Sequence, residues 1–378
     1  NILLGKSYVN YLWRNILSNI ISLCFKYIIL FVIENFQQSL SIYMKKKIHL
    51  FFRKPIKGQH FSIENWYYEI IKNFKNKNIE FIVKVCPLES TGVLNRIFIT
   101  FWAFFNQGDV NHVCGDINFI SLFLNKKKTI NTILDHHSLI RLKGIKRFIY
   151  YFFWVKIPSI RSHHLICISQ KTKKELIQYT NINKKKISVS DVCISDLFKK
   201  DIKKFTKNKP KILIVGTIIN KNIKNILTSL ININCELIII GNLNNEYLEI
   251  LKGYKIKYQN YVSLKHKQIL KKYIESDILL YVSKYEGFGM PILEAQTLGR
   301  AVITSNLDPM TYVGGKGALY VNPKNIKSIR NGVKQIINNG KLRNKLIVNG
   351  FENIKRFKKR NILQGHLNCY FNILKHNL

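Results

Sequence analysis

Short apolar runs alternate with longer amphipathic stretches along most of this 378-residue chain, from about residue 47 onward. Apolar runs of about four to eight residues, rich in Ile, Val and Leu, are typical of buried strands, whereas apolar positions about three or four apart are typical of helices. In the first part of the chain we expect strands at 48–52, 79–85, 110–113, 129–134 and 165–168. Helices are expected there at 62–74, 144–155 and 169–179.

The alternation starts again after a polar, Lys-rich stretch at 191–210. Strands are predicted at 211–216, 236–240, 278–282, 301–304 and 319–321, and helices at 222–230, 264–274, 291–298, 326–338 and 341–356. This pattern predicts an α/β fold with two Rossmann-like domains facing a central cleft, since ligands collect at the carboxyl ends of parallel strands. The predicted parts are an N-terminal domain at 44–200, a C-terminal domain at 201–360 and a helix at 361–378 that returns toward the N-terminal domain.

Residues 1–43 differ from the rest of the chain. A mostly apolar run at 16–33 is interrupted by Asn19 and Lys26. About 18 to 20 apolar residues span a bilayer, so the run is compatible with a membrane anchor or an uncleaved signal. The alternative is an extension upstream of a start at Met44, directly before the first predicted strand.

The chain is strongly basic, with a formal net charge of +40. An excess of Lys favours phosphate-rich partners such as nucleic acid, anionic lipid or nucleotide. The chain is also rich in Ile and Asn, and AT-rich coding would give the same composition without any function. Because no Arg-rich tail or RNP-like aromatic motif is present, we expect no nucleic-acid partner.

The seven cysteines are scattered and include no C-x-x-C pair. Neither a zinc site nor a disulfide framework is expected, and a reducing cytoplasm fits this pattern. No Asp-x-Asp pair follows a predicted strand, so we expect neither a metal nor another cofactor. The cysteines are Cys24, Cys86, Cys114, Cys167, Cys193, Cys235 and Cys369.

The strongest chemical pattern follows the strand predicted at 278–282. Two carboxylates, Glu286 and Glu294, flank a glycine loop, and Pro291 suits the first turn of a helix, in which we also expect Glu294. Glycines allow close backbone approach, and the N–H groups of a helix start attract anions, so the segment is a candidate diphosphate cradle. Paired carboxylates also fit a glycosidase, and a helix cap beside a solvated Glu is the structural alternative.

A second pattern follows the strand predicted at 211–216. Gly216 and Thr217 end that strand, and Lys221 lies at the opening of the next predicted helix. A Lys in this place can set its ammonium against phosphate oxygens. A glycine turn with a surface Lys is common in so basic a chain, but convergence with Glu286 and Glu294 would make a phosphate site.

These two segments resemble the family-four (group 1) retaining glycosyltransferases of the GT-B fold. The resemblance runs from about Met44 to the C-terminus, and its most specific part is EGFGMPILEA at 286–295. It also takes in GT at 216–217, KN at 221–222, RKP at 53–55, FSIE at 61–64, VCGDIN at 113–118 and CISQKTKKE at 167–175. The family implies a nucleotide-diphosphate-sugar donor, a glycan or lipid-linked glycan acceptor, and bacterial cell-surface polysaccharide or lipopolysaccharide assembly.

The resemblance also implies a role for each residue of the donor site. Lys221 would pair with the diphosphate, Glu286 would bind the sugar hydroxyls and stabilise an oxocarbenium-like transition state, and Glu294 would hold the ribose hydroxyls. Charges placed in advance in a dry cleft suit a departing diphosphate. The predicted donor-binding residues are Gly216, Thr217, Lys221, Gly287, Phe288, Gly289, Met290, Pro291 and Glu294.

One position departs from the family pattern. The family often carries a His-Asp pair after the fourth strand of its first half, and this chain has Leu134 and Asp135 there, followed by His136. We expect His136 to take over the role of that histidine, and the alternative is an ordinary loop residue. The predicted catalytic residues are Glu286, Lys221 and His136, and the predicted acceptor-side residues are Gly58 and His60.

A basic, aromatic stretch at 141–161 permits two interpretations. Lys143, Lys146, Arg147 and Lys156 border a run of aromatic residues, as in a helix that lies on an anionic membrane surface. The alternative is a helix packed on the first sheet with its aromatic side chains in the core. The first interpretation would place the protein peripherally at the inner face of the plasma membrane.

Other functions remain open at this stage. A sugar-nucleotide epimerase or a phosphorylase can share the fold, since fold does not fix function. A basic nucleic-acid-binding protein is the alternative from a different class. The sequence does not reveal the base of the nucleotide, the sugar, the acceptor or the linkage.

Overall fold

The computed structural model describes residues 26, 29, 45–55, 62–72, 74 and 78–376. The expected acceptor-side residues Gly58 and His60, and nearly all of the segment 1–43, lie outside the described residues. Residues 48–74 and 81–378 form one compact unit, to which the candidate site belongs. Within the part of the chain that is described, no helix combines the length and apolarity needed to cross a bilayer.

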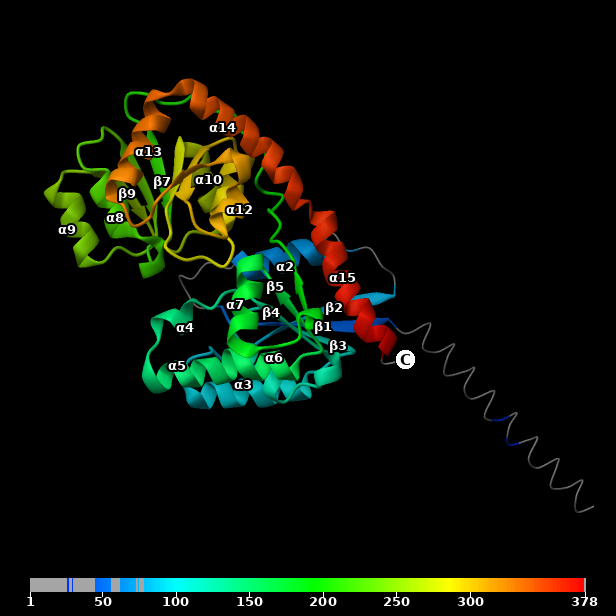
Figure 1. Cartoon of the computed structure of the whole chain (residues 1–378). Helices are drawn as coiled ribbons and strands as arrows, with labels where there is room; N and C mark the ends of the chain where they lie inside the picture. Colours follow the sequence, from blue (N-terminus) through cyan, green and yellow to red (C-terminus); the bar gives the residue numbers. More distant parts are fainter. Residues whose placement is uncertain are drawn as a thin grey trace, which may run out of the picture. The chain divides into compact units, whose positions relative to one another are not determined.

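The first sheet has six strands in the order β2-β1-β3-β4-β5-β6 (Figure 1). The neighbouring pairs from β1 to β6 are parallel. The short strand β6 is absent from the predicted elements because its three residues carry almost no pattern. The strands are β1 (Lys46–Phe52), β2 (Ile79–Val85), β3 (Val110–Val113), β4 (Thr129–Ile133), β5 (His164–Cys167) and β6 (Ile187–Val189).

The second sheet also has six strands, in the order β12-β11-β10-β7-β8-β9, and all its neighbouring pairs are parallel. The edge strand β9 reads Lys-Tyr-Gln-Asn-Tyr, so it lacks the apolar run by which its neighbours are recognised. Two parallel sheets of this kind confirm the predicted fold class. The strands are β7 (Lys211–Val215), β8 (Glu236–Ile240), β9 (Lys257–Tyr261), β10 (Ile278–Tyr281), β11 (Ala301–Ser305) and β12 (Leu319–Val321).

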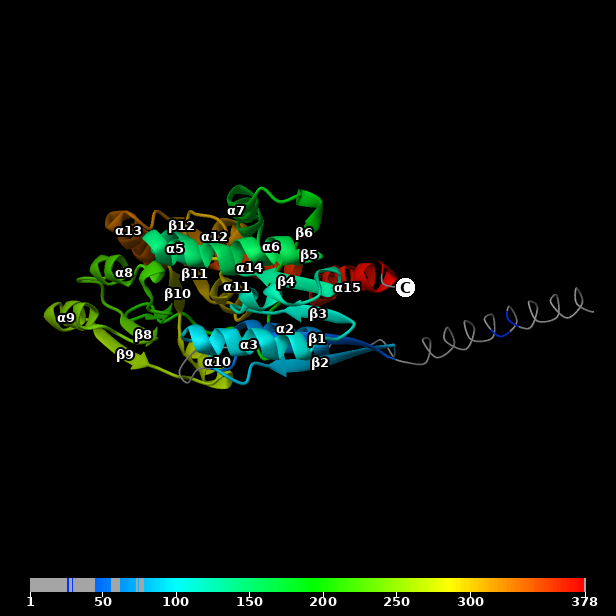
Figure 2. The ribbon, with the colours of Figure 1, turned by 90° about the horizontal axis from the view of Figure 1, so that it is seen from below.

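Helices connect the strands in both halves (Figures 1 and 2). The helix α3 is absent from the predicted elements because it is apolar almost all round, and so long an apolar stretch is ambiguous between strand and helix. The helix predicted at 144–155 continues to residue 161 as α5, a π-helical segment at Tyr151–Lys156 and α6. The helices are α2 (Ser62–Lys72), α3 (Val93–Phe105), α4 (His137–Arg141), α5 (Gly144–Tyr150), α6 (Ile157–Arg161), α7 (Gln170–Thr180), α8 (Ile223–Ser229), α9 (Asn245–Gly253), α10 (His266–Glu275), α11 (Met290–Thr297), α12 (Met310–Gly314), α13 (Ile326–Asn338), α14 (Gly340–Asn353) and α15 (Lys359–His376).

The strand order of the second sheet determines where a site can form. The strand β7 lies between β10 and β8. The connection after β7 therefore leads to β8 in one direction along the sheet, and the connection after β10 leads to β11 in the opposite direction. Because both strands point the same way, the loops that follow them emerge side by side at the carboxyl edge of the sheet. These are the two loops that carry the donor-site residues expected from the sequence.

The helix α11, which carries Glu294, packs against α14. The buried Gln296 amide donates to the Gly314 carbonyl (2.8 Å), and its oxygen accepts from the Asn353 amide (2.8 Å). Beside this pair, the backbones of Gly317 and Gly350 touch, and a Cβ on Gly317 would lie 2.5 Å from the Cα of Gly350. The orientation of α11 therefore depends on a contact that only glycine permits.

The substitution Gly317→Ala should lower the free energy of unfolding by about 2 kcal/mol, since the added methyl must displace the α14 backbone. The matched control is Gly365→Ala in α15, where a Cβ meets nothing within 4 Å. This control should stabilise the protein by up to about 1 kcal/mol, because alanine is the better helix former. Urea denaturation measures both changes, and equal stability of the two variants would contradict the packing described for α14.

Candidate active site

The loops after β7 and β10 are joined by hydrogen bonds. The Asn220 side chain donates to the Tyr285 carbonyl (2.8 Å), and the Lys284 N–H donates to the Asn220 carbonyl (2.8 Å). The buried Asn222 amide donates to the carbonyl of Val282 (3.2 Å), at the end of β10. These bonds fix one loop against the other, so the side chains they carry keep a defined relation.

Lys221 and Glu286 meet at this junction as the sequence predicted. The Lys221 ammonium donates to Glu286 Oε1 (2.7 Å) and to the Tyr281 hydroxyl (2.7 Å). The side chains of the pair are only 16% and 11% exposed, respectively. Gly216 has φ +84°, and a Cβ there would lie 3.0 Å from Lys221 Cε, so the glycine lets the lysine side chain run along the backbone. The two opposite charges are thus placed before any ligand arrives.

Glu294 lies on α11, but its expected position in the first turn is wrong. The helix begins at Met290, one residue before Pro291, so Glu294 is its fifth residue. Glu294 Oε2 accepts a hydrogen bond from the Tyr273 hydroxyl (2.6 Å). Burial raises the pKa of Glu294 to about 7, so the carboxyl changes charge near neutral pH.

The pKa of Tyr281 is affected by both Glu286 and Glu294. Burial, followed by the charge of Glu286 and, more weakly, that of Glu294, raises the pKa of Tyr281 well above its usual value. The phenol therefore stays neutral while it accepts the bond from Lys221. Both carboxylates act on this one side chain, which shows that Glu286 and Glu294 belong to the same neighbourhood.

The glycine loop between the acids packs tightly. A Cβ on Gly287 would collide with the Leu134 carbonyl oxygen, so the loop after β10 touches the loop after β4. Gly289 has φ +111° and caps α11, a conformation that favours glycine. The Phe288 side chain is buried against Phe357, with ring centroids 5.9 Å apart. Only the backbone of Phe288 is therefore placed to meet a ligand.

His136 is buried and connects the two halves. Its backbone N–H donates to the Tyr285 hydroxyl (3.0 Å), and the same hydroxyl donates to Glu175 Oε2 (2.6 Å). His136 Nδ1 lies 3.4 Å from Glu175 Oε2, and Lys171 pairs with Oε1 of that carboxylate (2.7 Å). Burial opposes ionisation of Glu175, but hydrogen bonds from His136, Lys171 and Tyr285 lower its pKa to about 2. Glu175 thus remains charged and holds His136 beside the loop that contains Glu286.

Three members of this network were missed by the sequence analysis. Glu175, Tyr285 and His137 are polar residues of ordinary type in unremarkable positions, and the ring of His137 stacks on that of Tyr285 with centroids 5.3 Å apart. Glu175 and Tyr285 are separated by 110 positions. Their sequence signals are weak: Glu175 ends the segment 167–175 that resembles the family, Tyr285 precedes Glu286, and His137 follows His136.

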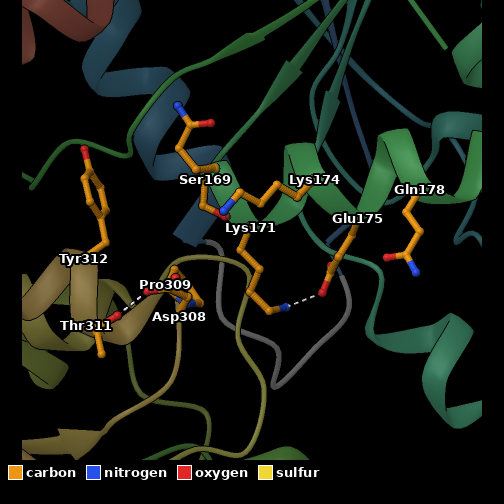
Figure 3. A pocket seen from close by; sticks show the side chains of 10 residues that line it. Ser169, Lys171, Lys174, Glu175, Gln178, Asp308, Pro309, Thr311 and Tyr312 are labelled. Atoms are coloured by element: carbon orange, nitrogen blue, oxygen red, sulfur yellow. Dashed lines mark hydrogen bonds and ion pairs between the residues drawn. The ribbon is translucent and has the colours of Figure 1, made fainter. Parts of the chain in front are cut away.

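A cavity of about 430 Å³ lies next to this network (Figure 3). It is lined by residues of α7, including Lys171 and Glu175, by the loop that contains Asp308, and by α12, which carries Tyr312. Both linings follow the carboxyl ends of parallel strands, β5 and β11. The cavity has the size of a small-molecule site, and neither Lys221 nor Glu286 lines it.

Across the described ranges, no group of three or more His, Cys, Asp or Glu side chains is arranged to hold a metal ion. The described cysteines are buried and unpaired. The expectation that the protein works without a metal stays a prediction.

Comparison with known proteins relates the chain to one family. The family model described as "Glycosyl transferases group 1" matches residues 196–353. The O-antigen chain mannosyltransferase RfbU of Salmonella typhimurium is 28% identical over 239 residues, which cover 61% of this chain and 65% of that protein. The chain thus spans slightly less than two thirds of this relative.

A second relative and a solved structure extend the likeness over more of the chain. The capsular polysaccharide biosynthesis glycosyltransferase CapM of Staphylococcus aureus is 26% identical over 281 residues, which cover 68% of this chain and 74% of that protein. The structure of Anabaena HepE in complex with UDP-glucose has a TM-score of 0.66 at 13% identity, covering 87% of this chain and 100% of that one. The fold is that of GT-B proteins, and the matched residues 196–353 include Lys221, Glu286 and Glu294. Over residues 196–353 the chain is therefore similar to the group 1 glycosyl transferases.

Proposed function

We propose that the protein transfers a sugar from a nucleotide-diphosphate-sugar to an acceptor hydroxyl, with retention of configuration. The observation that carries the proposal is the Lys221–Glu286 pair, set where the loops after two neighbouring parallel strands meet. The binding of UDP-glucose by HepE supports a donor of this class. The relatives named for O-antigen and capsular polysaccharide synthesis support a glycan or lipid-linked glycan acceptor, in polysaccharide or lipopolysaccharide assembly.

Lys221 is suited to bind the donor's diphosphate. An ammonium has three N–H donors, and within the described part of the chain Tyr281 and Glu286 engage two of them. The third can meet a phosphate oxygen without loss of the other two bonds. As negative charge grows on the leaving diphosphate, an ammonium already fixed in a largely buried site stabilises it at little reorganisation cost.

The two acids take unequal roles in this proposal. Glu286 forms an ion pair with Lys221 and accepts hydrogen bonds from sugar hydroxyls, while its charge stabilises the cationic sugar in the transition state. Glu294 accepts from the ribose hydroxyls, and its bond from Tyr273 orients it for this. The start of α11, at Gly289 and Met290, adds its N-terminal dipole to the binding of the phosphates.

The N-terminal domain forms the other side of the proposed donor site. The loop from Leu134 to His136 touches the glycine loop at Gly287 and Tyr285, so it covers the sugar side of the site. Exclusion of water there would favour transfer over hydrolysis. The reaction would need no metal, because Lys221 and backbone N–H groups neutralise the diphosphate. The setting we propose is the cytoplasm, at the inner face of the plasma membrane.

The variants Lys221→Ala and Glu286→Gln should each lower kcat/KM for the sugar nucleotide by about 100-fold or more, as removal of one preorganised transition-state contact does. Release of the nucleoside diphosphate from UDP-glucose, GDP-mannose or another sugar nucleotide used by the parent measures the effect. Thermal unfolding of each variant shows whether the fold is kept.

The matched control is a second Lys–Glu pair in the same domain, Lys224 with Glu246, which has the same 2.7 Å separation but side chains 65% and 49% exposed. Lys224→Ala and Glu246→Gln should leave kcat/KM within about twofold of the parent, since exposed ion pairs contribute little. Equal turnover by the parent and the Lys221 and Glu286 variants would show that the site is assigned wrongly.

Donor affinity should weaken as the pH falls through about 7. Burial raises the pKa of Glu294 to about 7, so the carboxylate that accepts from the ribose dominates only above that pH. Between pH 8 and pH 6, kcat/KM for the donor should fall by up to about tenfold, following the ionised fraction. The Glu294→Gln variant should be slower but nearly independent of pH over this range.

The raised pKa of Glu294 also affects the stability of the folded protein. Because the folded pKa of Glu294 lies above the unfolded value, ionisation lowers stability, and the full penalty applies above pH 7. Glu294→Gln should therefore raise the melting temperature of the donor-free protein at pH 8 more than at pH 5. Identical pH profiles for parent and variant would contradict the assignment of Glu294.

A further inference from the structure

The helix α3 presents an apolar stripe to the outside of the first domain. Its buried residues Ile99 and Ala103 pack into the core, and its other side is exposed although it is almost entirely apolar. Leu94 is 81% exposed and Phe105 is 79% exposed. The complete stripe is Val93, Leu94, Ile97, Phe98, Phe101, Phe104 and Phe105. Most exposed helix faces are polar, so a stripe of this length indicates a partner.

A second apolar stripe lies on the neighbouring helix. In α5 and the π-helical segment that continues it, Ile145, Phe148, Ile149 and Phe152 are exposed at helical spacing. The rings of Phe148 and Phe152 stack with centroids 6.3 Å apart. The aromatics expected on a membrane-surface helix are thus divided, since Trp154 is half-buried and packs against the core. Trp154 fits the interpretation in which the aromatic side chains pack into the core. Phe148 fits the interpretation in which they face a membrane surface.

The two stripes belong to one surface, which we call the α3–α5 face. Figures 1 and 2 show α3 and α5 on the same side of the first sheet. The guanidinium of Arg96 on α3 lies 4.8 Å from the ring centre of Trp154, which joins the two helices. The two stripes therefore lie on one side of the first domain, although the elements that carry them are 39 positions apart in sequence.

The charges on this face all have one sign. The segments 93–105 and 137–161 contain seven Lys and Arg residues and no Asp or Glu. Arg141, Lys143, Lys146 and Arg147 are exposed beside Ile145 and Phe148. A second copy of this face would bring like charges together, so self-association through it is opposed. Apolar side chains bordered by cations fit the headgroup and acyl boundary of an anionic bilayer.

We propose that the α3–α5 face docks on the surface of an anionic lipid bilayer, with the apolar stripes in the acyl boundary and the cations at the headgroups. The proposal does not depend on the donor chemistry of the cleft, because docking needs no nucleotide sugar. It assigns the membrane contact to a folded surface of the first domain.

The test uses the full chain with Cys24→Ser and one introduced cysteine carrying the environment-sensitive dye NBD. At Leu94→Cys or Phe148→Cys the dye emission should move to shorter wavelength and gain intensity when vesicles of phosphatidylcholine with phosphatidylglycerol are added. At the control position Ile202→Cys, which is 75% exposed outside the face, it should not change. Because the dye is attached to the α3–α5 face, its emission reports on contact of this face even if another part of the chain also binds the vesicles.

Co-sedimentation with the same vesicles gives a second measurement. The double variant Leu94→Ser with Phe148→Ser should bind the vesicles at least about tenfold more weakly than the parent protein. The control double variant, Ile202→Ser with Val348→Ser, changes exposed residues outside the face and should bind as tightly as the parent. Removal of Lys146 and Arg147 as Lys146→Gln with Arg147→Gln should weaken binding about fivefold per charge, and high salt should do the same.

Three results would overturn the proposal. One is dye emission at positions 94 and 148 that does not respond to anionic vesicles. Another is emission that is already blue-shifted without vesicles, which would show that a second copy or another part of the chain covers the face. The third is equal binding of both double serine variants.

Discussion

The candidate site depends on a charge pair between two loops that follow neighbouring strands. Lys221 comes after β7 and Glu286 after β10, and their side chains meet at 2.7 Å because these strands are adjacent in the sheet. A largely buried ion pair of this kind is costly to break, since the charge left behind would lie unpaired and poorly solvated. The pair therefore fixes the loops in the absence of a ligand and presents two opposite charges to whatever enters.

The first half is coupled to this pair through Tyr285, the residue before Glu286. Its hydroxyl connects His136 to Glu175, and Glu175 is in turn paired with Lys171 on α7. The position of the Glu286 loop is thus set from two sides, by Lys221 within its own domain and by this network from the other. Directional hydrogen bonds of this kind specify a geometry more strictly than apolar packing does.

The sequence predicted the parts of this arrangement that are local. Apolar runs revealed most strands of both sheets, and glycines beside Lys221 and Glu286 indicated a phosphate site because each loop follows a strand directly. The network of Glu175 and Tyr285 was not predictable, since it joins side chains 110 positions apart that no sequence pattern pairs with each other. The helix α3 was missed because it is apolar on both faces and lacks the polar face of an ordinary surface helix, and for the same reason its exposed outer face is apolar. The side chain of Phe288 packs on Phe357, so the donor contact expected from the backbone of this residue stays a prediction.

The central claim is that Lys221 and Glu286 form the binding site of a nucleotide-diphosphate-sugar. The most direct measurement is the melting temperature of the protein with UDP-, GDP- and ADP-sugars, each compared with its free nucleoside at the same concentration. A ligand at about 100 times its Kd stabilises the folded state by about 2.7 kcal/mol, which corresponds to a rise of a few degrees. We predict such a rise with one base in the sugar nucleotide and none with the nucleoside, because the diphosphate supplies the contact to Lys221. If no sugar nucleotide raises the melting temperature, or if the nucleoside alone raises it equally, the claim is contradicted.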